Sequence, residues 1–307
     1  MSTAIHRTSC PLCGSENQIV KLGIAIDHLV SQEHFELWDC HQCTLRFTQD
    51  IPSIQEIDRY YCSEQYISHT DTHQGLINRI YHIVRRVSLR TKFHWVQQDS
   101  AKIQGNILDI GCGTGAFLNM MRKQGWQVTG VETNAGAREK ARLLYRLDIL
   151  PEDALEKLQP QNFDVITLWH VLEHLYDLHG TFHQINRLLN KKGTLFIAVP
   201  NYTSADSKIY RENWAAYDVP RHLYHFSPAS MQYLAELHGF SIRLLHPMVY
   251  DAFYVSLLSE KYLNRSLGIL RAFWTGLKSG LSATADNNLS SSLVYVLTKK
   301  RKNYTAS

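Results

Sequence analysis

The chain has 307 residues with a formal net charge of +4, and 44% of them are hydrophobic, which is enough to fill the core of one large domain and a small one. No uncharged apolar stretch reaches the roughly 18 residues that a membrane span needs, and the N-terminal residues lack the apolar run of a secretory signal, so we expect a cytoplasmic protein with no transmembrane segment. An isoelectric point near 8.6 is too weakly basic to indicate a nucleic-acid surface.

Four of the six cysteines form two C-x-x-C pairs, Cys10 with Cys13 and Cys40 with Cys43. Two thiolates at this spacing grip one tetrahedral ion from a single tight turn, and disulfides are disfavoured in a reducing cytoplasm. Between the pairs, residues 17–26 and 33–39 alternate apolar and polar side chains as hairpin strands do. The pattern predicts a zinc-ribbon-like module over residues 1–50 with a closed, structural zinc site; reduced cysteines without metal are the alternative.

Residues 51–102 are expected to form a linker and a leading helix. The linker is polar and rich in tyrosine, with a short helix near 54–61 and an unpaired cysteine, Cys62. From Gly75 to Gln98 apolar residues recur at helical spacing, which predicts a helix that leads into the next domain.

Beyond residue 103, strand and helix patterns alternate, as is typical of a largely parallel sheet with helices on both faces. Strands are predicted near 106–110, 127–132, 163–168, 194–199, 240–246 and 292–298, with a weaker one near 147–150, and helices near 115–124, 134–146, 179–190, 228–238 and 251–279. The fold class is therefore α/β, a Rossmann-like seven-stranded mostly parallel sheet over residues 103–307.

The first of these strands runs into the turn LDIGCGTG, in which Asp109 precedes Gly111, Cys112, Gly113 and Gly115. Glycines let the backbone turn sharply and approach a ligand closely at the carboxyl edge of the sheet. The spacing G-x-G-x-G differs from the dinucleotide pattern G-x-G-x-x-G, although a nicotinamide dinucleotide remains the alternative ligand. Glu132 ends the second strand, and one carboxylate can accept two hydrogen bonds.

With these residues the chain resembles the class I S-adenosylmethionine-dependent methyltransferases, whose first motif is commonly D-x-G-C-G-T-G. The resemblance covers residues 103–246 well and includes the segments FDVI at 163–166 and KGTL at 192–195. It implies an enzyme that binds S-adenosyl-L-methionine, with Glu132 on the ribose and Asp153 near the adenine amino group. Asp109, the glycine loop with Cys112, and Trp169 complete the expected cofactor site.

Three chemically active side chains, His170, Glu173 and His174, follow Trp169. This H-x-x-E-H segment is similar to the E-x-x-E-H of ubiquinone-biosynthesis O-methyltransferases, which has been associated with a divalent ion that helps to ionise a phenol. In this chain His170 replaces the first acid. The i, i+4 spacing of the two histidines predicts a shared helical face; the alternative is a segment that only caps and packs a helix.

A second histidine-rich segment, PRHLYHF at 220–226, is similar to a P-R-H-L-x-H-F segment of a methyltransferase subgroup often encoded with surface-polysaccharide or quinone biosynthesis. His222 is the preferred catalytic base, with His174 and His170 as further candidates, and Arg221 is available to hold an anionic group. A purely structural lid is the alternative. Residues 251–281 are expected to form a helical insertion over the acceptor cleft, or alternatively an interfacial membrane helix or a dimer contact.

The predicted function is S-adenosylmethionine-dependent O-methylation of a small-molecule, quinone-type or glycan acceptor. The alternative is an RNA methyltransferase that docks through its zinc module, because some ribosomal-RNA methyltransferases also begin with CPLC. Residues 1–50 contain only three Lys or Arg side chains, Arg7, Lys21 and Arg46, whereas a backbone reader needs several phosphate contacts, so nucleic acid is not the expected partner. The acceptor atom and the oligomeric state are left open.

Overall fold

The computed structural model describes residues 4–61 and 76–300. Its central sheet has six strands in the order β5-β4-β6-β7-β10-β9. Their bounds are β4 (Asn106–Ile110), β5 (Gln127–Val131), β6 (Phe163–Trp169), β7 (Leu189–Pro200), β9 (Phe240–Pro247) and β10 (Ser292–Lys299). β10 is antiparallel to both of its neighbours, whereas the β5-β4-β6-β7 pairings are parallel, so the prediction of a mostly parallel α/β sheet is confirmed.

The weak seventh strand predicted near 147–150 is reduced to a single bridge between Leu150 and Val131. Two backbone hydrogen bonds, from Leu150 to Gly130 and from Glu132 to Leu150, hold this bridge. Pro151 follows at once and has no N–H to donate, so the pairing stops there. The seven-stranded expectation is thus corrected to six strands and one bridge.

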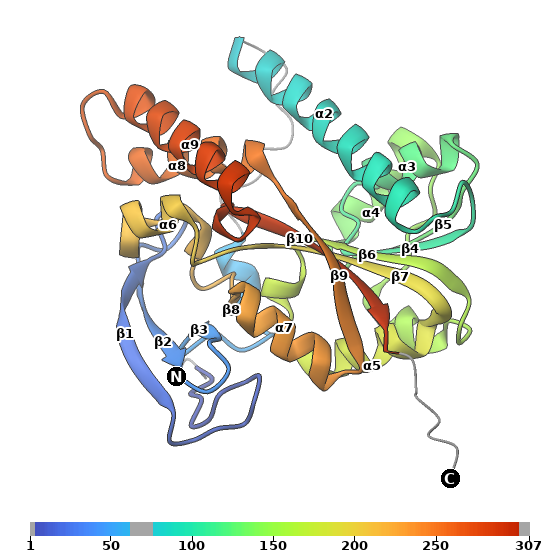
Figure 1. Ribbon diagram of the computed structural model, residues 1–307, viewed down its shortest axis with the longest axis horizontal. Coiled ribbons are helices and arrows are strands. Elements are labelled where there is room, and N and C mark those ends of the chain that lie inside the picture. The colour runs from blue at the N-terminus through green and yellow to red at the C-terminus, as the bar shows by residue number, and fades with distance from the viewer. Residues whose placement is uncertain (1–3, 62–75, 301–307) are drawn as a thin grey trace.

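Helices cover both faces of the sheet. On one side lie α2 (Leu76–Asp99), α3 (Ala116–Lys123) and α4 (Ala135–Tyr145), and on the other α5 (Leu178–Leu188) and α7 (Pro228–Leu237) (Figure 1). Buried apolar side chains of the strands alternate between two core clusters; Leu108 and Ile166 belong to one, and Ile107 and Val165 to the other. The sheet therefore separates two cores, because successive side chains of a strand point to opposite faces of the sheet.

The single helix predicted over 251–279 is instead a hairpin of α8 (Val249–Tyr262) and α9 (Gly268–Ala285). Asn264 and Leu267 between them have φ angles of 46° and 63°, which a continuous helix does not allow. The remaining short helices are α6 (Ala205–Tyr210) and the 3₁₀ helices η1 (Ile57–Tyr60), η2 (Glu152–Lys157), η3 (Leu172–His174), η4 (Arg211–Asn213), η5 (Ala215–Tyr217) and η6 (Asn287–Leu289). Among the described helices, none has the length and hydropathy required to cross a membrane.

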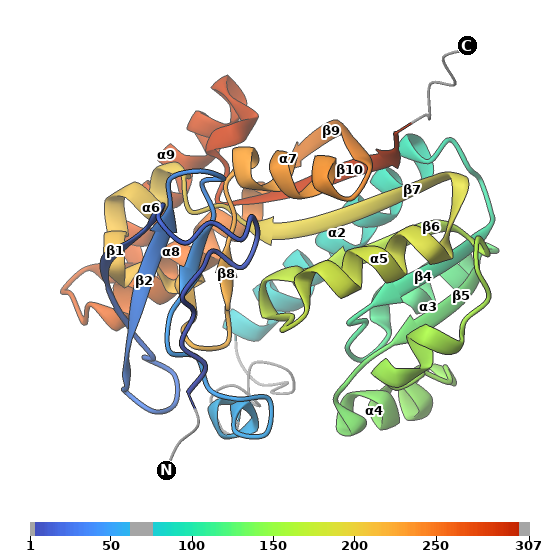
Figure 2. The same cartoon turned by 90° about the horizontal axis from the view of Figure 1, so that it is seen from below.

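The N-terminal strands β1 (Ile19–Ile26), β2 (His34–Cys40) and β3 (Arg46–Thr48) form a second sheet in the order β1-β2-β3-β8. Its fourth strand, β8 (Tyr224–His225), comes from the PRHLYHF segment, almost 180 residues later in the chain. The division at residue 50 stays a prediction, but this module shares a sheet with the PRHLYHF segment. Figure 2 shows the module grouped with β8, α6, α8 and α9 at the end of the molecule toward which the arrowhead of β7 points. Cys62 lies outside the described residues.

Candidate functional site

The glycine loop after β4 presents bare backbone to open space. Gly111, Gly113 and Gly115 all have positive φ, from 53° to 74°. A Cβ added to Gly111 would lie 2.4 Å from Val171, so the loop is packed on that side. At Gly113, in contrast, a Cβ would meet no described atom within 4 Å. This open side is where a ligand can approach the backbone, and it fits a nucleoside-type cofactor.

Glu132 stands beside this opening at the end of β5. One carboxylate oxygen accepts a 2.9 Å hydrogen bond from the Gly113 amide, and the other accepts one of 2.9 Å from the Asn134 amide. The Thr133 hydroxyl also donates a 3.3 Å hydrogen bond to the oxygen that Asn134 contacts. A carboxylate has about four lone-pair sites, so the oxygen that faces Gly113 retains capacity for a ribose hydroxyl. The geometry suits the predicted ribose role, which stays a prediction.

Asp109 lies under the loop, and its side chain is buried. Its carboxylate accepts a 2.6 Å hydrogen bond from the Thr167 hydroxyl, and burial raises the pKa of Asp109 to about 7. The ring of Trp169, at the end of β6, packs edge-on against Phe117. The thiol of Cys112 lies against Gly130, and burial raises its pKa.

Lys92 of α2 lies at this site and is not among the residues predicted from the sequence. Its ammonium lies 4.7 Å from the ring centroid of Trp169, and burial lowers the pKa of Lys92 despite the nearby charges of Asp251 and Asp109. The sequence does contain a feature that indicates a special role for this lysine, because Lys92 is a charged residue within the apolar face of α2, next to Phe93.

Asp153 lies in η2, exposed, with its carboxylate 3.1 Å from the ammonium of Lys157. Its expected role near the adenine stays a prediction.

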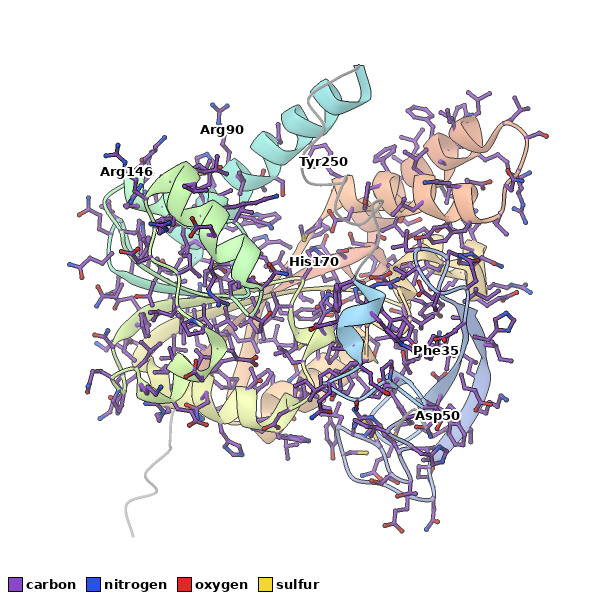
Figure 3. All side chains as sticks on the ribbon, turned by 180° about the vertical axis from the view of Figure 1, so that it is seen from behind. Phe35, Asp50, Arg90, Arg146, His170 and Tyr250 are labelled. Atoms are coloured by element: carbon purple, nitrogen blue, oxygen red, sulfur yellow. The ribbon has the colours of Figure 1, made fainter. Side chains whose placement is uncertain are left out.

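The prediction that His170 and His174 share a helical face is wrong. His170 has a φ of 58°, so the chain leaves β6 through a left-handed residue and makes only the single turn η3. The His170 ring lies between Glu173, at 3.5 Å, and Asp251 of α8, at 3.2 Å. Burial alone would lower the pKa of His170, but the two carboxylates raise it to about 9. Figure 3 shows His170 in the middle of the molecule, between the sheet and the hairpin of α8 and α9.

His174 instead meets His222 of the PRHLYHF segment. Their ring centroids are 4.6 Å apart, and ligand atoms of Glu173, His174 and His222 lie within 4.8 Å of one another. Nδ1 of His174 faces the Arg221 carbonyl at 3.0 Å, and Nδ1 of His222 faces the Ala216 carbonyl at 2.8 Å. Because a carbonyl only accepts, each Nδ1 carries a proton. Burial and the neighbouring His222 lower the pKa of His174 to about 4, so the His174 ring is neutral and its Nε2 keeps a lone pair.

Glu173 is the third member of the group formed with His174 and His222. Its side chain is 1% exposed, and neither carboxylate oxygen accepts a hydrogen bond within the part of the chain that the structure describes. Burial acts to raise the pKa of Glu173, but His170 and the neighbouring histidines hold it below its usual value. An ionised carboxylate beside two imidazole rings is a donor set that can hold a divalent ion.

The expectation that Arg221 holds an anionic acceptor is wrong. Its side chain is 1% exposed, and its donors are directed to the carboxylates of Asp218 and Asp27 and to the carbonyl of Tyr60. The guanidinium is therefore a structural link between the module and the PRHLYHF segment.

The four paired cysteines converge on one point, as predicted. The Sγ atoms of Cys10 and Cys43 are 3.5 Å apart, as are those of Cys13 and Cys40, and all four lie within 4.8 Å of one another. These separations are too long for disulfides of about 2.05 Å and close to the edge of about 3.8 Å that four 2.3 Å zinc–sulfur bonds make in a tetrahedron. The donor set and its spacing fit a structural zinc ion.

The three basic side chains of the module are already engaged. Lys21 pairs with Glu36, and Arg46 pairs with Asp39 and lies over the ring of Tyr202. Arg7 contacts the ring and hydroxyl of Tyr224. Each of these cations thus has an acidic or aromatic partner within the described residues, and three such side chains are fewer than the several free cations that a row of phosphates requires.

Comparison with known proteins gives a family and a fold. The model of a family described as "Methyltransferase domain" matches residues 81–245. The ubiquinone biosynthesis O-methyltransferase of Histophilus somni is 33% identical over 125 residues, which are 37% of this chain and 52% of that protein. The same enzyme of Klebsiella pneumoniae is 32% identical over 102 residues, 31% of this chain and 42% of that protein. The chain thus spans about half the length of the curated relatives it matches.

Among solved structures, the magnesium protoporphyrin IX methyltransferase of Synechocystis PCC 6803, with bound SAH, matches with a TM-score of 0.53. The match covers 80% of this chain and 100% of that chain at 13% identity, so it concerns the fold alone.

Proposed function

Because the chain belongs to the methyltransferase domain family, as a class I S-adenosylmethionine-dependent enzyme, we propose that it methylates a hydroxyl group of a small aromatic, quinone-type or glycan acceptor. One observation carries the choice of a hydroxyl: the neutral ring of His174 and the ring of His222 lie side by side next to the buried carboxylate of Glu173. A hydroxyl must lose its proton for transfer to be completed, and a neutral imidazole is suited to take it. The similarity to ubiquinone biosynthesis O-methyltransferases supports the same class of acceptor.

On this proposal the cofactor occupies the open side of the glycine loop. Glu132 binds the ribose, and the side chains of Asp109 and Trp169 close the site beneath and beside the loop. The cofactor supplies an electrophilic methyl group, which an acceptor oxygen displaces in line, so positioning contributes much of the rate. His222, or His174 beside it, takes the acceptor proton on Nε2, while the Nδ1 hydrogen bonds hold each ring in place.

The four thiolates are proposed to hold one structural zinc ion. Zinc there stabilises the turns on which β2 and β3 depend, and β3 pairs with β8 directly after His222. The ion is thus expected to stabilise the position of β8 and the neighbouring His222 through β3, and to take no part in methyl transfer.

The test uses the full chain, S-adenosylmethionine with an isotopically labelled methyl group, and a fractionated cell extract, with mass spectrometry of the products. Label in a methoxy group of a small molecule supports the proposal. Label that appears only in RNA, only on nitrogen or carbon, or in no product overturns it. A Glu132→Ala variant, which lacks the proposed ribose ligand, controls for labelling by contaminating enzymes.

A further inference from the structure

The exposed side of α9 carries an apolar strip. Six large apolar side chains at the start of this helix and along it are each more than half exposed: Leu267, Ile269, Leu270, Phe273, Trp274 and Leu281. We call these six residues the α9 strip. Scattered exposed apolar residues are ordinary, but a contiguous set of this size on one helix marks a surface that is covered in function.

The opposite side of α9 is fixed to the protein, so the strip is held outward. Ala272 is 3% exposed and Ser279 is buried, and the Ser279 hydroxyl donates a 2.9 Å hydrogen bond to the buried carboxylate of Asp206. A Cβ at Gly276 would lie 2.6 Å from the ring of Phe253, which shows how closely α9 approaches α8. The helix is thus amphipathic, with a small-residue face inward and a large apolar face outward.

The charged side chains on α9 itself are all basic, and the exposed Asp286 follows its last residue. Between Gly268 and Ala285 the sequence contains no acidic residue, whereas Arg271 and Lys278 are exposed on the helix and Arg265 is exposed in the turn before it. Arg271 lies 3.6 Å from the buried Glu260, but Arg265 and Lys278 have no ion-pair partner among the described residues. Cations beside an apolar face with Trp and Phe are the features of a helix that lies in the headgroup region of a membrane.

We propose that the α9 strip docks this protein onto an anionic lipid surface, with the apolar side chains in the headgroup region and Arg265 and Lys278 against lipid phosphates. A second copy of the chain is a less suitable occupant, because a two-fold contact would bring the same cations together. Lipid phosphates complement these cations and cover the apolar side chains at the same time.

The strip borders the proposed acceptor site. α8 packs along α9, and its first turn carries Asp251, which contacts His170. Tyr250, next to it, is 51% exposed, and Figure 3 shows it near the surface, away from the central His170. Docking through α9 therefore brings the acceptor side close to the bilayer. The docking inference itself does not depend on which acceptor is methylated.

The experiment is co-sedimentation of the full chain with vesicles of phosphatidylcholine alone and with about 30% phosphatidylglycerol. We expect binding to the anionic vesicles that weakens with salt. The double variant Phe273→Ser/Trp274→Ser should bind about tenfold more weakly, because it removes the two aromatic side chains of the strip. Its matched control is Leu143→Ser/Leu144→Ser on α4, where two adjacent leucines are 70% and 64% exposed, and this control should bind as the wild type does.

The charge arm compares Arg265→Glu/Lys278→Glu with Lys191→Glu/Lys192→Glu, an exposed pair far along the chain from α9. Only the first should lose about tenfold or more in affinity for anionic vesicles. Circular dichroism and cofactor binding confirm that each variant is folded. The proposal is overturned if the wild type does not sediment with anionic vesicles, or if an α9 variant and its control lose the same amount of vesicle binding. It is also overturned if analytical ultracentrifugation shows a wild-type dimer that Phe273→Ser/Trp274→Ser abolishes while vesicle binding is unchanged, because a second copy of the chain would then cover the α9 strip.

Discussion

The guanidinium of Arg221 donates a 2.9 Å hydrogen bond to the carboxylate of Asp27, and both side chains are buried. Asp27 lies in the turn between β1 and β2, where it also accepts hydrogen bonds from the amides of Leu29 and Ser31. The same guanidinium contacts Asp218, whose carboxylate is 3.9 Å from the His222 ring. A chain of charged contacts thus leads from the module to the candidate base.

Asp27→Asn should lower the free energy of unfolding by about 3 kcal/mol, because it leaves a buried guanidinium with one carboxylate in place of two. Arg221 holds the pKa of Asp27 below its usual value although burial acts to raise it. A depressed folded pKa contributes stability that is present above the unfolded pKa of about 3.9 and is lost as the pH falls below it. Urea denaturation at pH 7 and near pH 3.5 measures both effects.

The matched control is Asp50→Asn, which removes a carboxylate that is 49% exposed and paired with His6. It should change the free energy of unfolding by less than about 1 kcal/mol. An Asp27→Asn protein as stable as this control at pH 7 would contradict the role given to the buried pair.

Glu132→Gln should weaken binding of S-adenosylhomocysteine by roughly 1.5–3 kcal/mol, the scale of hydrogen bonds to a charged acceptor. The substitution keeps the size of the side chain but removes the charge and one acceptor oxygen. Isothermal calorimetry measures the change, with Glu139→Gln as the control, because Glu139 is an exposed acid on the neighbouring α4. Equal affinities of the two variants for S-adenosylhomocysteine would contradict the assignment of Glu132 as a ligand of the ribose.

Asp109→Asn should make the free energy of unfolding depend less on pH between about pH 4 and pH 7. The pKa of Asp109 is raised by burial to about 7, so the folded protein binds a proton there that the unfolded chain has released above about pH 4. The wild type therefore loses stability from this group as the pH rises from about 4 to 7, on the order of 2–4 kcal/mol, and the neutral Asn variant does not.

The quantity to compare between the two proteins is the change in unfolding free energy from pH 5 to pH 8. In the Asn variant, an altered hydrogen bond to Thr167 affects the unfolding free energy equally at both pH values, so it cancels in this difference. Asp153→Asn is the control, because its carboxylate is 70% exposed and its neutralisation should leave the slope unchanged. A wild-type slope identical to that of Asp109→Asn would mean that Asp109 titrates normally.

The parts of the site that could be predicted from sequence are local. The glycine loop, Glu132 and the cysteine pairs each lie within one turn or at one strand end, where spacing alone constrains the geometry. The meeting of His174 with His222, and of Asp27 with Arg221, depends on how distant segments pack, which spacing does not encode. The helical face predicted for His170 failed for a local reason, because a left-handed residue ends β6 and no glycine marks it.

One zinc ion per chain should be found by elemental analysis, and Cys40→Ser should abolish it. Cys112→Ser is the control, because Cys112 lies in the glycine loop, far from the four thiolates, and should keep its zinc. Zinc loss should lower turnover more than cofactor affinity, because β3 pairs with β8 beside His222 and not with the glycine loop. Protein purified without stoichiometric zinc, yet with the module still protected from proteolysis, would refute the site.

His222→Gln should lower turnover by roughly 10²–10⁴ and leave S-adenosylhomocysteine affinity nearly unchanged, because the imidazole acts on the acceptor proton and not on the cofactor. His174→Gln tests the neighbouring ring in the same way, and His183→Gln, on the exposed side of α5, is the control. Steady-state kinetics with the acceptor found by labelling give turnover, and calorimetry gives affinity. If excess Mg²⁺ or Mn²⁺ restores turnover to the His222→Gln protein, and chelation removes it from the wild type, His222 is a metal ligand. If turnover of both His→Gln variants stays within about threefold of the wild type, the acceptor arrives already ionised, and positioning alone accounts for the rate.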